Sequence, residues 1–299
     1  MTPDRGEGIA ALEPVPPIVL VLAGATSIQF GAGLAATLFD DLGPGGTSLL
    51  RLGFAALVLL AVWRPRPSRH PASHLRLAIL FGLVLGSMNL CFYEAIDRIP
   101  LGAAVTIEFI GPIGLATLLS RRPADFAWVA LAVAGILLLA RPWSSADALD
   151  TVGLIFVAIA AVLWALYIVL AQRAGRVFSG GEGLSIAMLA GALVPVIPGI
   201  AQAGTDLLDP RLLAAGFGVA LLSSVIPYSL ETEALRRMPA RVFGVLMSLE
   251  PAVAVLAGFI VLGQQLGVVD LAAVGLVVAA SIGVTATAPA LVPEAMIDA

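Results

Sequence analysis

Three charged side chains lie inside long apolar runs of this sequence. Glu108 is in the stretch VTIEFIGP, Glu250 is in MSLEPAVA, and Arg51 is in TSLLRLGF. A carboxyl group in such surroundings can bind an ammonium group or exchange a proton, and a guanidinium group can bind a carboxylate. Each group can instead hold helices together through a hydrogen bond or an ion pair inside the protein. The residue types alone leave both uses open.

The composition indicates that these groups lie in a membrane protein. Of 299 residues, 60% are hydrophobic and 12% are charged, whereas soluble domains are about 25% charged. A charge at the bilayer centre costs about 3 kcal/mol, so the spans that carry these side chains must turn them towards a cavity or a partner. Ten runs are long enough to cross the hydrocarbon core. They lie at 16–38, 46–63, 75–95, 101–119, 124–140, 151–171, 183–203, 212–230, 242–262 and 268–288.

The distribution of arginine predicts the orientation. All positive residues of the chain except its two histidines are arginines, and placing both termini in the cytoplasm leaves only Arg98, Arg141 and Arg211 in outer loops. The single cysteine has no partner for a disulfide, and both histidines lie outside the spans, which argues against a zinc site in the membrane. We expect no metal or organic cofactor and no nucleic-acid partner.

The two halves of the sequence resemble each other. EAIDRIP at 94–100 matches EALRRMP at 233–239, and the same offset carries Pro112 onto Pro251. We therefore predict an all-α, polytopic protein whose ten transmembrane helices form two five-helix repeats, 1–145 and 146–299. Because five is odd, the second repeat crosses the membrane in the opposite direction. Inverted repeats of this kind usually place the substrate site at their interface near the midplane.

Further residues within the spans extend the candidate site, although each can equally serve packing or helix contacts. They are Gln29, Asn89, Tyr93, Trp164 and Tyr228. A second group consists of helix breakers, which can act as gating kinks or as inert bends. These are Gly111, Pro112, Pro227 and Pro251. Glu94 and Glu231 lie near span ends, where we expect solvated side chains.

Four stretches resemble the EamA-domain carriers of the drug/metabolite transporter superfamily, and most closely the bacterial threonine/homoserine exporter group. They are SIQFGAGLAATLF at 27–39, LLRLGFAAL at 49–57, FYEAIDRIPLGAAVTIEFIGP at 92–112 and SSVIPYSLETEALRRMPARVFGVLMSLEPA at 223–252. The resemblance implies a monomeric carrier in the lipid bilayer of the bacterial inner membrane. It also implies export of small amino acids such as threonine and homoserine, driven by the proton gradient. The two repeats predict that transport proceeds by alternating access.

The resemblance marks motif positions without assigning roles to them. These positions are Gln29, Arg51, Asn89, Tyr93, Glu108, Pro112, Tyr228, Glu250 and Pro251. An amino acid is a zwitterion, which Arg51 could bind together with Glu108 or Glu250. A carrier of drugs or other small metabolites is the alternative. An intramembrane enzyme is not expected, because the spans lack histidine and a buried aspartate pair.

Overall fold

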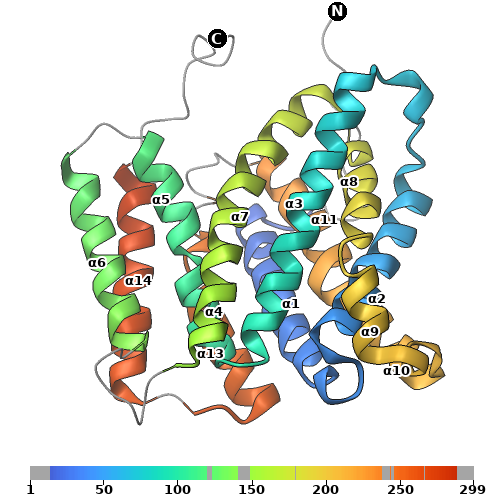
Figure 1. Ribbon diagram of the computed structural model, residues 1–299. Helices are drawn as coiled ribbons and strands as arrows, with labels where there is room; N and C mark the ends of the chain where they lie inside the picture. The colour runs from blue at the N-terminus through green and yellow to red at the C-terminus, as the bar shows by residue number, and fades with distance from the viewer. Residues whose placement is uncertain are drawn as a thin grey trace, which may run out of the picture.

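The computed structural model describes residues 14–119, 123–140, 149–178, 180–237, 243, 246–265 and 267–287 (Figure 1). The regular structure in these ranges is helical. In the first half the helices are α1 Pro17–Ala36, α2 Phe39–Trp63, η2 Pro67–Arg69, α3 Ala72–Ile96, α4 Leu101–Glu108, α5 Ile110–Leu119 and α6 Pro123–Ala140. In the second half they are α7 Thr151–Val177, α8 Glu182–Ala192, α9 Val196–Ala203, η3 Gly204–Leu208, α10 Pro210–Ala220, η4 Leu221–Val225, α11 Ile226–Arg237, α13 Glu250–Leu262 and α14 Val268–Thr287.

The helices fit a polytopic membrane protein. Among the described residues, five helices are long and apolar enough to cross a membrane, and a sixth span results if Glu182–Ala192 and Val196–Leu208, bent by 48°, are counted together. Shorter apolar helices occupy Leu101–Leu115, Phe126–Leu139, Glu250–Leu262 and Val268–Gly283. The expected all-helical membrane fold is therefore confirmed. The start of the span expected at 242–262 includes positions outside the described residues.

Several spans are interrupted where the sequence places its helix breakers. Helix α4 ends at Glu108 and α5 begins at Ile110, so Gly111 and Pro112 lie in the first turn of α5. Helix α13 begins at Glu250, and Pro251 occupies its first turn, where a missing N–H costs little. Pro227 follows the π-helical turn η4. Two of the buried glutamates thus lie directly at helix ends.

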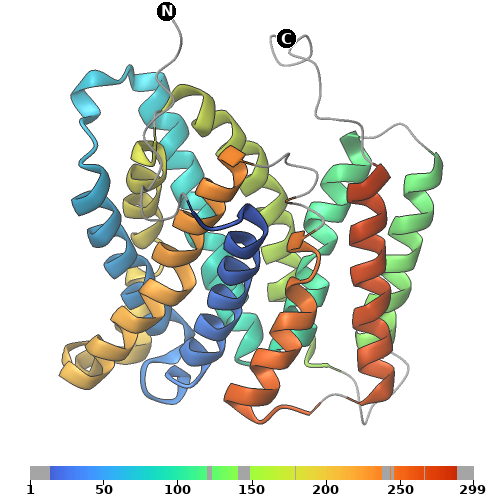
Figure 2. The ribbon, with the colours of Figure 1, turned by 180° about the vertical axis from the view of Figure 1, so that it is seen from behind.

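Three sets of helix contacts build the bundle. Helix α3 packs against α7 and α8, and α1 packs against α10, η4, α11 and α13. Helices α6 and α14 pair with each other and lie to one side of the remaining helices in both views (Figures 1 and 2). Since α4 and α5 contact α7, the bundle interior lies between helices from both halves of the chain.

Small residues let helices α3 and α8 approach closely. Gly82 and Gly86 on α3 face Ala187 and Gly191 on α8, each pair spaced by four residues. A Cβ on Gly86 would overlap the carbonyl oxygen of Gly191. Because lipid gives little hydrophobic drive for helix association, such close backbone contact is a main source of packing energy.

We expect Gly86→Ala to destabilise the protein by about 1–3 kcal/mol, because the added methyl group forces α3 and α8 apart. Gly53→Ala is the matched control, since a Cβ at Gly53 has no neighbour within 4 Å and alanine favours the helix. The measurement is the temperature at which half of the purified protein in detergent loses its monodisperse elution peak. Equal temperatures for the two variants would contradict the assigned packing.

Candidate functional site

A cavity of about 110 Å³ lies inside the bundle and is lined by residues from both halves. Helices α1, α2, α3, α4, α7, α11 and α13 all contribute to its wall. The predicted binding residues in the wall are Gln29, Arg51, Asn89, Glu108, Trp164, Tyr228 and Glu250. Tyr93, the remaining predicted residue, lies behind the wall and packs against Arg51. The fold therefore gathers residues that are far apart in the sequence around one space.

Arg51 is held in place by neutral groups. It is 3% exposed, its Nε donates to Ser224 Oγ at 3.1 Å, and its Nη2 donates to the Ser223 carbonyl oxygen at 2.9 Å. The guanidinium carbon lies 5.2 Å from the centre of the Tyr93 ring, which is a favourable cation–π distance. No carboxylate of the described residues forms a salt bridge with Arg51. The arginine thus remains able to bind an anionic group in the cavity.

The π-helical turn η4 provides these acceptors. A π-helical turn is wider than an α-helical turn and is frequent at functional sites. Its carbonyl groups bind two neighbouring helices, since Ser27 Oγ on α1 donates to Leu222 O at 2.7 Å and Arg51 on α2 donates to Ser223 O. A Cβ on Gly31 would overlap Ser223, so only glycine lets α1 approach this turn so closely.

Three glutamates from three helices face the cavity. Glu108 on α4 is 9% exposed, Glu250 on α13 is 4% exposed, and Glu231 on α11 is half-buried. None of their carboxyl groups forms a hydrogen bond or ion pair with another described residue. Glu108 interacts electrostatically with Arg51, and Glu250 interacts with both Glu231 and Glu108. Carboxyl groups in such a wall can bind an ammonium group or a proton.

Several uncharged residues of the site also have polar atoms without a hydrogen-bond partner among the described residues. The Oε1 atom of Gln29 and the hydroxyl of Tyr93 are buried without a hydrogen-bond partner among the described residues. Asn89 Nδ2 donates to Leu85 O at 2.8 Å, which leaves its side-chain oxygen for other contacts. Trp164 packs edge-on against Phe109 with ring centres 4.9 Å apart. In the part of the chain that the structure describes, no group of three histidine, cysteine or acidic side chains could hold a metal ion.

Glu231 and Glu94 are more buried than predicted. Glu231 was expected to be solvated but lines the cavity, and its spacing of three from Tyr228 puts both on one helix face. That spacing was the available signal. Glu94 was also expected to be solvated, and this prediction is wrong, because Glu94 is only 9% exposed. The available signal was its spacing of four from Arg98, which suits an ion pair on a helix but was not used in the prediction.

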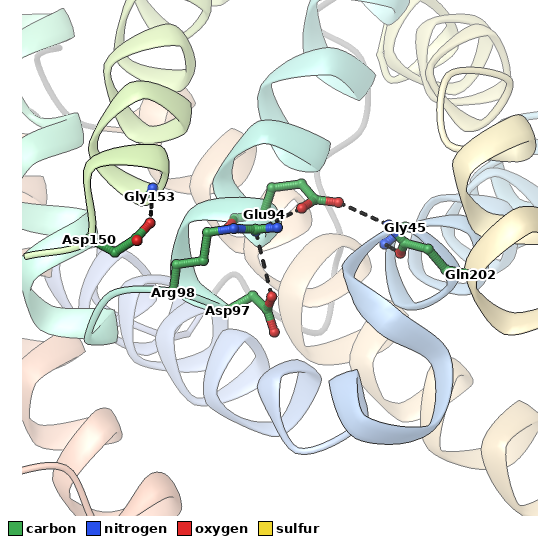
Figure 3. A network of polar contacts seen from close by, with 7 residues as sticks. All are labelled: Gly45, Glu94, Asp97, Arg98, Asp150, Gly153 and Gln202. Carbon is green, nitrogen blue, oxygen red and sulfur yellow. Dashed lines mark hydrogen bonds and ion pairs between the residues drawn. The ribbon is translucent and has the colours of Figure 1, made fainter.

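Glu94 belongs to a polar network that joins the two halves at one end of the bundle (Figure 3). Arg98 Nη1 donates to Glu94 Oε2 at 2.8 Å, and Gln202 Nε2 donates to Glu94 Oε1 at 3.1 Å. Gln202 Oε1 in turn accepts a hydrogen bond from the Gly45 backbone N–H at 2.6 Å. Partial burial raises the pKa of the nearby Asp97 carboxyl, and Arg98 opposes that rise. The network therefore fixes α3 and α2 to α9.

Comparison with known proteins agrees with the resemblance seen in the sequence. A model of the EamA-like transporter family matches residues 151–286. The threonine/homoserine exporter RhtA of Escherichia coli (strain K12) is 44% identical over 272 residues, covering 91% of this chain and 92% of that exporter. The RhtA of Salmonella typhimurium (strain LT2) is 43% identical with the same coverage. These relatives are transporters and not enzymes, as predicted.

One solved crystal structure supports the fold. It aligns with 90% of this chain and 97% of its own, with a TM-score of 0.61 and 18% identity. At this identity the likeness shows the fold alone.

Cysteine labelling tests whether the cavity holds water. In a Cys91→Ser background we expect Met88→Cys, on the cavity wall, to react several-fold faster with a charged methanethiosulfonate than Leu83→Cys. Leu83 is the control because it lies on the same helix and is 42% exposed on the outer surface of the bundle, where lipid excludes the reagent. Mass spectrometry of protein labelled in membranes gives the rates. Faster labelling at 83 would show that the assigned cavity is not the water-filled space.

Proposed function

The chain belongs to the EamA-like transporter family, and we propose that it is a secondary transporter of the bacterial inner membrane that exports small amino acids such as threonine and homoserine. The observation that carries the proposal is the cavity wall with both charge signs. It combines Arg51 with buried carboxyl groups in one space. The names of relatives more than 40% identical supply the substrates.

The charges suit a zwitterion. A free amino acid carries a carboxylate, which the planar guanidinium of Arg51 can bind, and an ammonium group, which carboxylates can bind. In a low-dielectric cavity each contact is much stronger than in water. The size supports the same conclusion, because the cavity of about 110 Å³ is smaller than the roughly 300–1,000 Å³ typical for drug-sized ligands.

We further propose that the chain consists of two inverted five-helix repeats, 1–145 and 146–299, giving ten transmembrane helices with both termini in the cytoplasm. The packing supports this arrangement. By the sequence offset between the halves, α3 corresponds to the segment from α10 to α11, and α7 corresponds to α1. Helix α3 packs against α7, and the segment from α10 to α11 likewise packs against α1. The helix breaks beside Glu108 and Glu250 also occupy nearly equivalent positions.

Transport would proceed by alternating access. Because the cavity wall comes from both repeats, rocking one repeat against the other would open the site to either side of the membrane. Gly111, Pro112, Pro227 and Pro251 would absorb the bending, since each lies within or beside a helix break. A proton would occupy Glu108 or Glu250 and leave when the substrate binds, which couples export to the proton gradient. We expect the carrier to act as a monomer.

The export of drugs or other small metabolites is the second candidate. Its specific support is the excess of acid in the cavity wall, where three glutamates accompany one arginine. Such a wall could also bind a hydrophobic amine. Loss of amino-acid transport together with retained resistance to cationic drugs would favour this alternative.

Counterflow of labelled threonine in proteoliposomes tests the proposal. We expect exchange by the wild type, competition by homoserine, and at least a tenfold loss in Glu108→Gln or Glu250→Gln, because a neutral amide cannot replace a carboxylate towards a cation or a proton. Glu182→Gln is the matched control. Glu182 pairs with His70 at 3.0 Å away from the cavity, and its replacement should leave exchange unchanged.

The absence of exchange by folded wild-type protein would rule out threonine as substrate. Exchange at the wild-type rate in a Glu108→Ala, Glu250→Ala double variant would show that neither carboxyl takes part in transport.

A pH gradient tests proton coupling. Proteoliposomes loaded with threonine should release it several-fold faster when the outside is made more acidic, because inward proton flow then drives export. A protonophore should abolish the difference. We expect Glu250→Gln or Glu108→Gln to lose this stimulation. Release that is equal with and without the gradient would reject coupling while leaving the carrier itself in place.

A further inference from the structure

Glu231 and Glu250 both line the cavity. Helices α11 and α13, which carry them, both pack against α1. The two carboxyl groups are near enough to interact electrostatically. The side chain of Glu231 also packs against Gly24 of α1. Its Cγ lies 3.5 Å from the position that a Cβ on Gly24 would occupy.

Arg51, the positive charge of the site, interacts with groups other than Glu231 and Glu250. Arg51 hydrogen-bonds η4, stacks on Tyr93, and interacts electrostatically with Glu108. Neither Glu231 nor Glu250 has a comparable interaction with a cationic group among the described residues. Glu250 also interacts electrostatically with Glu108, but of the three glutamates only Glu108 has Arg51 as a partner of opposite charge. The cavity wall therefore has a guanidinium group beside Glu108 and two further carboxyl groups, those of Glu231 and Glu250.

Two carboxylates in a low-dielectric space repel each other, and a cation between them offsets that repulsion. Glu250 is only 4% exposed, faces the cavity, and has no hydrogen bond or ion pair within the described part of the chain. A third acceptor lines the same cavity, because Gln29 on α1 has a buried Oε1 without a partner in the described ranges. An ammonium group has three donors and suits such a set of acceptors.

We infer that Glu231 and Glu250 form a subsite for the ammonium group of the substrate, while Arg51 receives its carboxylate. This inference rests on the proposed function and deepens it. It assigns Glu231 a role in binding and gives the substrate a direction in the cavity. In the empty carrier a proton can occupy the same pair, so proton and ammonium group compete for it. The subsite accepts primary ammonium ions and requires no metal.

Analogues that lack one charge separate the two parts of the site. Threoninol keeps the ammonium group of threonine, and 2,3-dihydroxybutyrate keeps its carboxylate. In calorimetric titrations of the full-length protein in detergent, Glu231→Gln should weaken threonine and threoninol at least tenfold. It should leave 2,3-dihydroxybutyrate within about threefold of the wild type. Glu182→Gln is the control and should leave all three affinities unchanged.

The outcomes distinguish this inference from the proposed function. Wild-type affinity for threonine and threoninol in Glu231→Gln overturns the subsite, and so does an equal loss for all three ligands. If the wild type does not bind threonine, threonine is ruled out as the substrate. The binding of threoninol then tests the ammonium subsite by itself. Binding of threoninol that Glu231→Gln abolishes then upholds the subsite, and no binding by the wild type overturns it.

A second variant covers the case in which Glu231→Gln does not fold. Gly24→Val keeps every charge but places methyl groups against the Glu231 side chain, whose Oε1 lies 3.7 Å from where the Cβ of residue 24 would stand. The displaced carboxyl group should weaken threonine and threoninol and spare 2,3-dihydroxybutyrate. Unchanged affinity for all three ligands would overturn the inference.

Discussion

The cost of keeping Arg51 charged inside the bundle determines how the site is built. A guanidinium group does not lose its proton in proteins, so the structure must supply acceptors wherever it places one. Here the acceptors are the carbonyl oxygen of Ser223 and the hydroxyl of Ser224, together with the ring of Tyr93. The π-helical turn η4 makes that carbonyl available, and Ser27 on α1 uses its neighbour. The turn η4 thereby joins α1, through Ser27, to α2, through Arg51, and Arg51 also contacts Tyr93 on α3.

Close helix contacts and helix breaks occur in different parts of the bundle. Gly82 and Gly86 hold α3 to α8 backbone against backbone, a contact that tolerates little movement. The breaks at Phe109 and before Glu250 interrupt the hydrogen-bond ladder of spans that contribute carboxyl groups to the cavity. Since Glu108 and Glu250 stand where the backbone is interrupted, bending at these breaks under the proposed alternating access would also move their carboxyl groups.

Much of the fold could be predicted from the sequence, because length and hydropathy decide which segments cross a bilayer. The helix breaks were also predictable, since proline removes a backbone donor wherever it stands. The site was predicted less completely. Glu231 was assigned to solvent from its distance to the end of a span, but the face of the helix decides exposure, and that face depends on how α11 packs on α1. The π-helical turn that holds Arg51 has no comparable signal in the sequence.

The matched sequences of the two halves lie in different surroundings. In EAIDRIP, Glu94 pairs with Arg98 and also binds Gln202 of the other half. In EALRRMP, Glu233 pairs with Arg237 at 3.1 Å, and Arg237 donates to the carbonyl oxygen of Val15 at 3.2 Å. Both segments thus keep the ion pair between their glutamate and their arginine, but the pair makes its further contact through Glu94 in one segment and through Arg237 in the other. Both ion pairs therefore reach the other half of the chain, because Gln202 lies in the second half and Val15 lies in the first. Under the proposed alternating access, the contact at each end would have to break when that end of the bundle opens.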